Sequence, residues 1–86
     1  MLAEDKIKNT FNELLGSKLE IRRRQLLKRQ VDVELKASIA RGHYSDIETG
    51  KASPDSYTLY KLSRALGFDL NKAMDEIEEE MNGKKE

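Results

Sequence analysis

Apolar residues recur at helical spacing through most of this 86-residue chain. Leu59, Leu62 and Leu66 fall at positions i, i+3 and i+7, which places them on one face of a helix. Asp55 precedes this segment, and its carboxylate can accept hydrogen bonds from the free amides of a first turn. Gly67 follows Leu66 and can adopt the left-handed conformation that ends many helices. The pattern therefore predicts a helix between Asp55 and Gly67.

A second stripe lies near the C-terminus, where Leu70, Met74, Ile77 and Met81 are spaced by four, three and four residues. Such heptad-like spacing is typical of a helix with one apolar seam. Most of the glutamates of this segment fall off the seam. We predict an acidic C-terminal helix over 69–82 and a frayed tail over 83–86.

The N-terminal third carries a stripe of Ile7, Phe11, Leu14 and Leu15, and the stripe continues past Gly16. No proline interrupts it, so this third is predicted to form one or two helices. Residues 31–37 alternate between apolar and polar, which taken alone would suit a strand. We reject the strand because nothing else in the chain could pair with it, and its backbone groups would stay unsatisfied.

The segment over 40–48 is predicted to be a short helix, because Ala40, Tyr44 and Ile47 fall at i, i+4 and i+7. Its outward positions hold small or polar residues rather than long solvating side chains. A helix that presses into a groove would present such a face. The outward residues are Gly42, Ser45, Asp46 and Thr49, with Arg41 at the edge.

Composition supports an all-α chain with one modest core. Apolar and charged residues each make up 37%, there is one proline, and there is no cysteine. A chain of this length buries only roughly 60% of its unfolded surface, which argues against a two-domain enzyme with a closed cleft. A coiled coil or partial disorder are the alternatives in this composition class. No disulfide or thiolate–metal framework can form, and a lone histidine, His43, does not make a metal site.

The net charge of zero hides an asymmetry along the sequence. Residues 16–30 carry six basic side chains against Glu20, whereas residues 67–86 carry seven acidic against three basic side chains. A basic block followed by an acidic end can orient a protein on phosphate even when the total is neutral. Apolar runs are too short for a membrane span or a signal peptide, so the cytoplasm is the expected location.

Residues 47–67 read IETGKASPDSYTLYKLSRALG. This stretch resembles the Cro/repressor-type, Xre-like helix-turn-helix family, which reads I-E-x-G-K-x-x-P-[SD]-x-x-T-L-x-K-[IL]-[AS]-x-A-L-G. The match is dense and ungapped, and the resemblance extends over roughly 15–73. It implies a compact five-helix, lambda-repressor-like DNA-binding domain over 15–68. Residues 1–14 would then form an N-terminal helical extension, and 69–82 an acidic C-terminal helix.

Carrying the register backwards places Gly16 on the glycine of the family's first helix and Gln30 on the glutamine that opens the second. It also places Arg23 on an arginine that, in many members, forms an ion pair with the glutamate equivalent to Glu48. The upstream half departs from the family at several positions, among them Lys28, which stands where the family prefers an apolar residue. Glu34 stands where the family prefers a small alanine, and Ser38 stands where it prefers a glycine.

The resemblance implies a recognition helix that reads bases with Arg41, Gly42, Ser45 and Asp46. Arg41 can present two donors to guanine, and Asp46 can accept from cytosine. Gly42 can either leave room for a base or mark a loose start of the helix. Contacts to the DNA backbone, which set register rather than sequence, are expected from the following residues. They are Arg29, Gln30, His43, Thr49, Lys51 and Ser53.

The resulting hypothesis is a sequence-specific regulator of double-stranded DNA, namely a repressor that binds an inverted repeat as a homodimer. The seam of Leu70, Met74, Ile77 and Met81 can be intramolecular core or the dimer interface, and we favour the dimer. The Ile7–Leu15 stripe is a second candidate surface. A toxin or an antirepressor is a conceivable protein partner, and no enzyme activity, cofactor, metal or membrane is expected. The alternative is a protein-interaction module with weak or no DNA binding.

Overall fold

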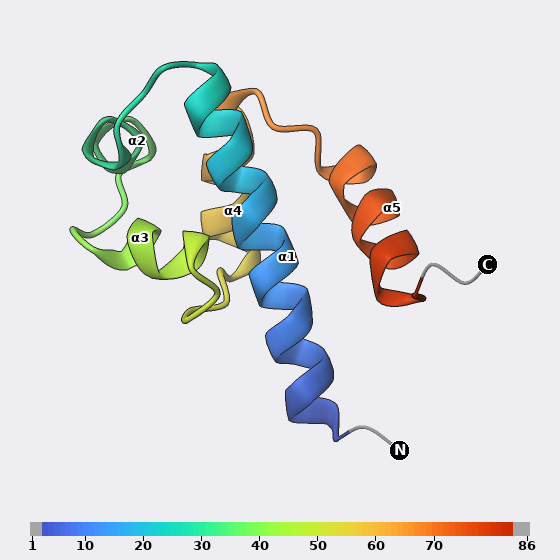
Figure 1. The fold of residues 1–86 in the computed structure, drawn as a ribbon. Helices are drawn as coiled ribbons and strands as arrows, with labels where there is room; N and C mark the ends of the chain where they lie inside the picture. The colour runs from blue at the N-terminus through green and yellow to red at the C-terminus, as the bar shows by residue number, and fades with distance from the viewer. Residues whose placement is uncertain (1–2, 84–86) are drawn as a thin grey trace.

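The computed structural model describes residues 3–83, and these residues form five helices and no strand (Figure 1). The helices are α1 (Glu4–Gln25), α2 (Gln30–Ala37), α3 (His43–Glu48), α4 (Ser56–Leu66) and α5 (Leu70–Met81). The predicted all-α, five-helix architecture is confirmed, and residues 31–37 are helical. Within this described part, no helix has the length and apolar character needed to cross a membrane.

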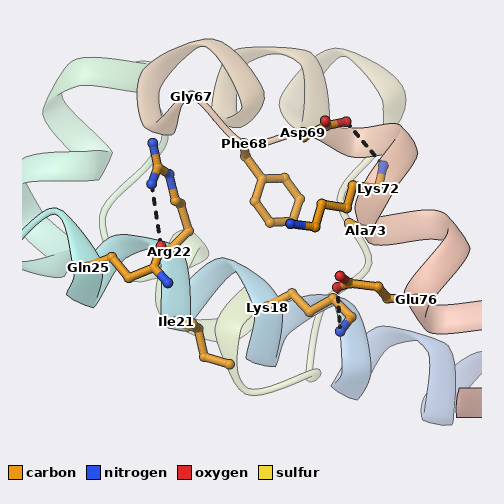
Figure 2. Close-up of a pocket in the computed structure, with 10 residues that line it drawn as sticks. All are labelled: Lys18, Ile21, Arg22, Gln25, Gly67, Phe68, Asp69, Lys72, Ala73 and Glu76. Atoms are coloured by element: carbon orange, nitrogen blue, oxygen red, sulfur yellow. Dashed lines mark hydrogen bonds and ion pairs between the residues drawn. The ribbon is translucent and has the colours of Figure 1, made fainter.

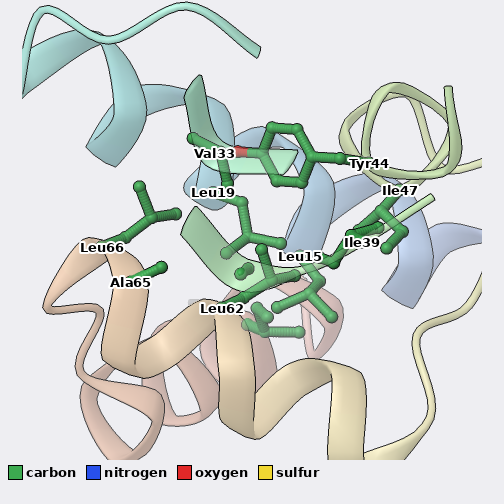
Figure 3. Close-up of a cluster of buried hydrophobic side chains, with 11 residues drawn as sticks. Leu15, Leu19, Val33, Ile39, Tyr44, Ile47, Leu62, Ala65 and Leu66 are labelled. Carbon is green, nitrogen blue, oxygen red and sulfur yellow. The ribbon is translucent and has the colours of Figure 1, made fainter. Parts of the chain in front are cut away.

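The long α1 runs through the molecule, with α2 and α3 on one side and α5 on the other (Figure 1). The hydrophobic core lies where the first four helices meet and also includes Ile77 of α5. Figure 3 shows side chains of this core converging. Leu19, Tyr44 and Leu62 are completely inaccessible to solvent. Burial raises the pKa of the Tyr44 hydroxyl, and the nearby Glu48 carboxylate raises it further. Tyr44 therefore acts in the core as a large neutral side chain.

The N-terminal third is one continuous helix rather than two, so the expected boundary between 14 and 15 falls inside α1. Gly16 explains why α1 and α3 can come together. A Cβ atom at this position would overlap the carbonyl oxygens of Ile47 and Glu48. The missing side chain thus lets the end of α3 lie directly against α1.

The ends of α4 follow the sequence prediction. The Asp55 carboxylate accepts a hydrogen bond from the Thr58 amide at 2.8 Å, and Gly67 ends the helix with a φ of 60°. Arg22 of α1 reaches the same end of α4, where its Nε donates to the Leu66 carbonyl at 2.8 Å. Asp55 thus caps the N-terminal end of α4, and Arg22 fixes the C-terminal end against α1.

The predicted start of the third helix at Ala40 is wrong, because α3 begins at His43. Gly42 precedes it with a φ of 83°, a left-handed conformation that cannot continue a right-handed helix backwards. Ala40 is consequently exposed, and Ile39 occupies the core in its place. Ser38 ends α2 with a φ of 56°, so this serine adopts the left-handed conformation for which the family uses glycine.

The apolar seam of α5 faces α1 of the same chain. Ala73 and Ile77 are buried there, and Met74 and Met81 pack at the margin of the core. Ile77, which we favoured as a dimer contact, is therefore an intramolecular core residue in this structure. Lys18 of α1 strengthens the junction by pairing with Glu76 at 3.2 Å (Figure 2) and with Glu80 at 3.1 Å. Of the predicted frayed tail, residues 84–86 lie outside the described range.

Candidate nucleic-acid interface

A polar network joins the three helices that build the candidate interface. Arg23 of α1 donates from Nε to Glu48 Oε2 at 2.7 Å and from Nη2 to Glu48 Oε1 at 3.2 Å. Its remaining nitrogen, Nη1, donates to the Lys28 carbonyl in the α1–α2 turn at 2.8 Å. Gln30, the first residue of α2, donates from Nε2 to Glu48 Oε1 at 2.8 Å. A single carboxylate at the end of α3 thus holds α1 and α2 in register.

The ion pair at the centre of this network is buried. The side chains of Arg23 and Glu48 are only 9% and 2% exposed. Burial alone would raise the pKa of the Glu48 carboxyl. The Arg23 guanidinium, the neighbouring Tyr44 hydroxyl and the Gln30 amide together outweigh burial and hold that pKa below its ordinary value. Glu48 is therefore ionised at neutral pH, and the fork of Arg23 can keep α3 in a fixed orientation.

Glu34 gives the α2–α3 turn a contact that the sequence analysis did not foresee. Its carboxylate accepts a hydrogen bond from the Gly42 amide at 2.8 Å, and the residue is 9% exposed. Since Gly42 is the residue before α3, this bond ties the start of α3 to the middle of α2. The departure from the family's alanine was the signal that could have pointed to this role.

The outer face of α3 is polar, as the helical pattern predicted. Tyr44, Ile47 and Glu48 are buried, whereas Asp46 is exposed and Ser45 half-exposed. Gly42 lies at the start of this face, and a Cβ there would meet no neighbouring atom. Its left-handed backbone favours the interpretation that it marks the helix start.

Arg41 is exposed and lies in the turn that leads into α3 rather than on the helix itself. Its guanidinium makes no hydrogen bond or ion pair with any residue in the range 3–83, and Arg41 lines the same groove as Gly42 and Ser45. The structure thus brings these three predicted base contacts together on one surface. The guanidinium remains available for an external acceptor.

The residues predicted to contact the DNA backbone differ in how they are engaged. The exposed Arg29 forms an ion pair with Asp32 at 3.0 Å, and its hydrogen bonds lower the pKa of that carboxyl. The Thr49 hydroxyl donates within α3, to the carbonyls of Ser45 and Asp46 at 3.2 Å each. The Gln30 amide is shared with Glu48, as described above.

Two of the other three backbone candidates lie in the loop after α3, and the third, His43, lies at the start of that helix. Lys51 and Ser53 are exposed between α3 and α4, and no polar contact of their side chains exists within residues 3–83. His43 is half-buried at the start of α3, close enough to Asp55 to help lower the pKa of that carboxyl after the bonds from Thr58. This loop therefore adds one free cation, Lys51, near the polar face of α3.

The fold and the site together define a helix-turn-helix DNA-binding protein: α2 supports α3, and α3 presents a polar outer face beside an uncommitted arginine. The helix-turn-helix family model matches residues 19–72, well over half of the chain. The chain belongs to this family, in its Cro/C1-type, Xre-like form. No curated protein and no solved structure gave a significant match. Family membership identifies a DNA-binding transcription regulator.

Proposed function

We propose that the protein is a sequence-specific repressor that binds an inverted repeat of double-stranded DNA as a homodimer. The observation that carries the proposal is the unpaired Arg41 beside the polar face of a rigidly held α3. Arg41, Gly42, Ser45 and Asp46 would lie against base edges in the major groove. A cytoplasmic location and a purely binding, non-enzymatic role belong to the same proposal.

The DNA backbone would be held by residues around this face. Lys51 and Ser53 are free to bind phosphate. Arg29 can exchange Asp32 for phosphate, because an exposed ion pair is weak. Gln30 has a second amide proton beyond the one given to Glu48. His43 and Thr49 flank the same surface.

A homodimer formed through α5 would have to keep Ile77 in the core of its own subunit. Leu70, Met74 and Met81 are partly exposed along α5 and could supply the outer contacts. Two subunits would read two half-sites about one helical turn apart, which raises both affinity and specificity. Repression would follow from occupancy of a promoter, under the control of protein concentration or of a partner such as a toxin or an antirepressor.

A protein-interaction module is the second candidate, favoured by one observation. Tyr57 and Tyr60 of α4 are 66% and 58% exposed, and their rings stack with centroids 6.4 Å apart. Lys61 lies 4.8 Å above the Tyr57 ring. Exposed tyrosines are enriched in protein interfaces, so this pair would be the place to dock a partner.

Selection from a randomised duplex pool at two salt concentrations tests the proposal. We expect recovery of an inverted repeat, with binding that weakens steeply as salt rises because phosphate contacts release counterions. Sedimentation of the protein with the recovered duplex gives the number of subunits. Absence of retention on any duplex at low salt would reject DNA binding and favour the interaction module.

A further inference from the structure

A groove of about 570 Å³ lies between α2 and the segment that leads into α3. Two apolar side chains of α2 border it, Val31 and Leu35, which are one helical turn apart. They are 43% and 76% exposed. Arg41 and Ser45 line the same groove. The groove is therefore part apolar and part polar, and it is continuous with the surface that we assign to base contacts.

Glu34 and Gln30, the other polar side chains of the groove, are already hydrogen-bonded within the protein, and the remaining amide proton of Gln30 is the one assigned above to phosphate. Glu34 accepts the Gly42 amide, and Gln30 donates to Glu48. The side chains left to meet a ligand are the methyl groups of Val31 and Leu35, the Arg41 guanidinium and the Ser45 hydroxyl. A ligand that fits them has a small apolar group beside hydrogen-bond acceptors.

We propose that this groove receives the C5-methyl group of a thymine, with Leu35 and Val31 as specificity-determining residues of α2. This inference rests on the proposed DNA-binding function. Thymine is the base that presents a methyl group in the major groove, and guanine beside it would offer the acceptors for Arg41. The expected half-site therefore contains a thymine next to the base pair that Arg41 reads.

The size of the apolar surface argues for a base rather than a protein in this groove. Stable protein interfaces bury about 800 Å² on each partner. Two side chains one turn apart provide only a fraction of that area, whereas a methyl group needs no more than the pair offers. The shared lining with Arg41 and Ser45 also places the apolar pair where a base edge must pass if those residues read DNA.

The test replaces each thymine of the selected duplex, one at a time, by deoxyuridine, which removes the methyl group and nothing else. For the unaltered protein we expect one thymine per half-site at which the replacement weakens binding about fourfold, as for the loss of one buried methyl group. In Leu35→Ala this ratio should fall to about one. In Leu35→Met, which keeps an apolar side chain, most of the ratio should remain.

Ile21→Ala is the matched control, because Ile21 is also an exposed apolar residue, 54% exposed against 76% for Leu35. It lines a different pocket, between α1 and α5 (Figure 2). It should keep the full sensitivity to deoxyuridine. Equal sensitivity of Leu35→Ala and the unaltered protein, or no sensitive thymine at all, would overturn the inference while leaving DNA binding intact. Failure to retain any duplex would instead overturn the proposed function itself.

Discussion

At the scale of single residues, the position of the recognition helix depends on one buried carboxylate. Glu48 receives three hydrogen bonds, two from Arg23 and one from Gln30. Removing either charge would leave the other buried without its counter-charge, which costs far more than the pair itself contributes. The network thus couples the stability of the fold to the orientation of α3.

We expect Glu48→Gln and Arg23→Met each to lower the free energy of unfolding by roughly 3–5 kcal/mol, because each strands a buried partner. Urea denaturation followed by circular dichroism measures the change. Glu20→Gln is the control, because Glu20 pairs with Arg24 at 2.8 Å on the surface of α1. That exposed pair should contribute no more than about 0.5 kcal/mol. Similar losses from both pairs would contradict the burial argument.

The same carboxylate makes stability depend on pH. Because the pKa of Glu48 in the folded chain lies below its ordinary value of 4.5, its contribution is fully present above that value. It is lost as the pH falls through the folded-state pKa. The difference in unfolding free energy between the unaltered protein and Glu48→Gln should therefore be constant near neutrality and shrink below pH 4.5. A difference that does not change with acidification would show that Glu48 is not held in its charged form.

Arg41 and Lys51 should separate sequence reading from backbone binding. Arg41→Ala should weaken binding to the selected site by about 1–3 kcal/mol and relax the preference at one base pair. Lys51→Ala should weaken all duplexes alike and lower the salt slope by about one. Binding measured on the selected site and on all its single-base variants distinguishes the two. If both substitutions weaken every duplex equally, Arg41 is not a base-reading residue.

At the scale of elements, the crossing of α1 and α3 is set by a glycine inside a helix. Helix propensity alone favours alanine over glycine by about 1 kcal/mol. At Gly16 the sign should reverse, since a Cβ would run into the carbonyls of Ile47 and Glu48. The two helices would have to separate, and the Arg23–Glu48 pair would be stretched with them.

Gly16→Ala should therefore destabilise the protein by more than about 2 kcal/mol, a cost comparable to overpacking a core. Ser17→Ala, at the exposed next position, should be neutral or slightly stabilising. Thermal unfolding of the two variants gives the comparison. A Gly16→Ala variant as stable as Ser17→Ala would mean that α1 and α3 do not approach as closely as described.

The elements also show how far sequence reasoning extends. The caps at Asp55 and Gly67 were predictable because each acts through its own local chemistry. The start of α3 was not, because the pattern of Ala40, Tyr44 and Ile47 fits a helix equally well whether or not Gly42 turns left-handed. Glu34 was recognised as unusual, but its bond to Gly42 depends on how α2 and α3 pack. The hydrophobic pattern of a single sequence therefore predicts local features such as helix caps, but it does not predict the contacts between helices.

At the scale of the whole molecule, a chain of zero net charge can bind DNA only if its charges are separated in space. The acidic α5 lies across α1 from α2 and α3 (Figure 1). Packed helices are 8–10 Å apart, so the exposed acids of α5 are roughly 16–20 Å or more from the recognition face. The Debye length at physiological salt is about 8 Å. The repulsion between the acidic side chains of α5 and bound DNA is therefore largely screened at physiological salt.

This geometry predicts that the place of a charge matters more than the total. Glu78→Lys with Glu79→Lys replaces two negative by two positive charges on the exposed side of α5 and so shifts the net charge of a neutral chain by four units. Affinity for the selected duplex at physiological salt should nevertheless change less than about threefold, because screening removes most of the effect at that distance. Lys51→Glu alters the charge by only two units, but next to α3, and should weaken binding by tenfold or more. Titrations at low and physiological salt test both, with the α5 variant gaining affinity chiefly at low salt. A large gain from the α5 variant at physiological salt would mean that DNA approaches α5 and that α2 and α3 do not form the principal binding face.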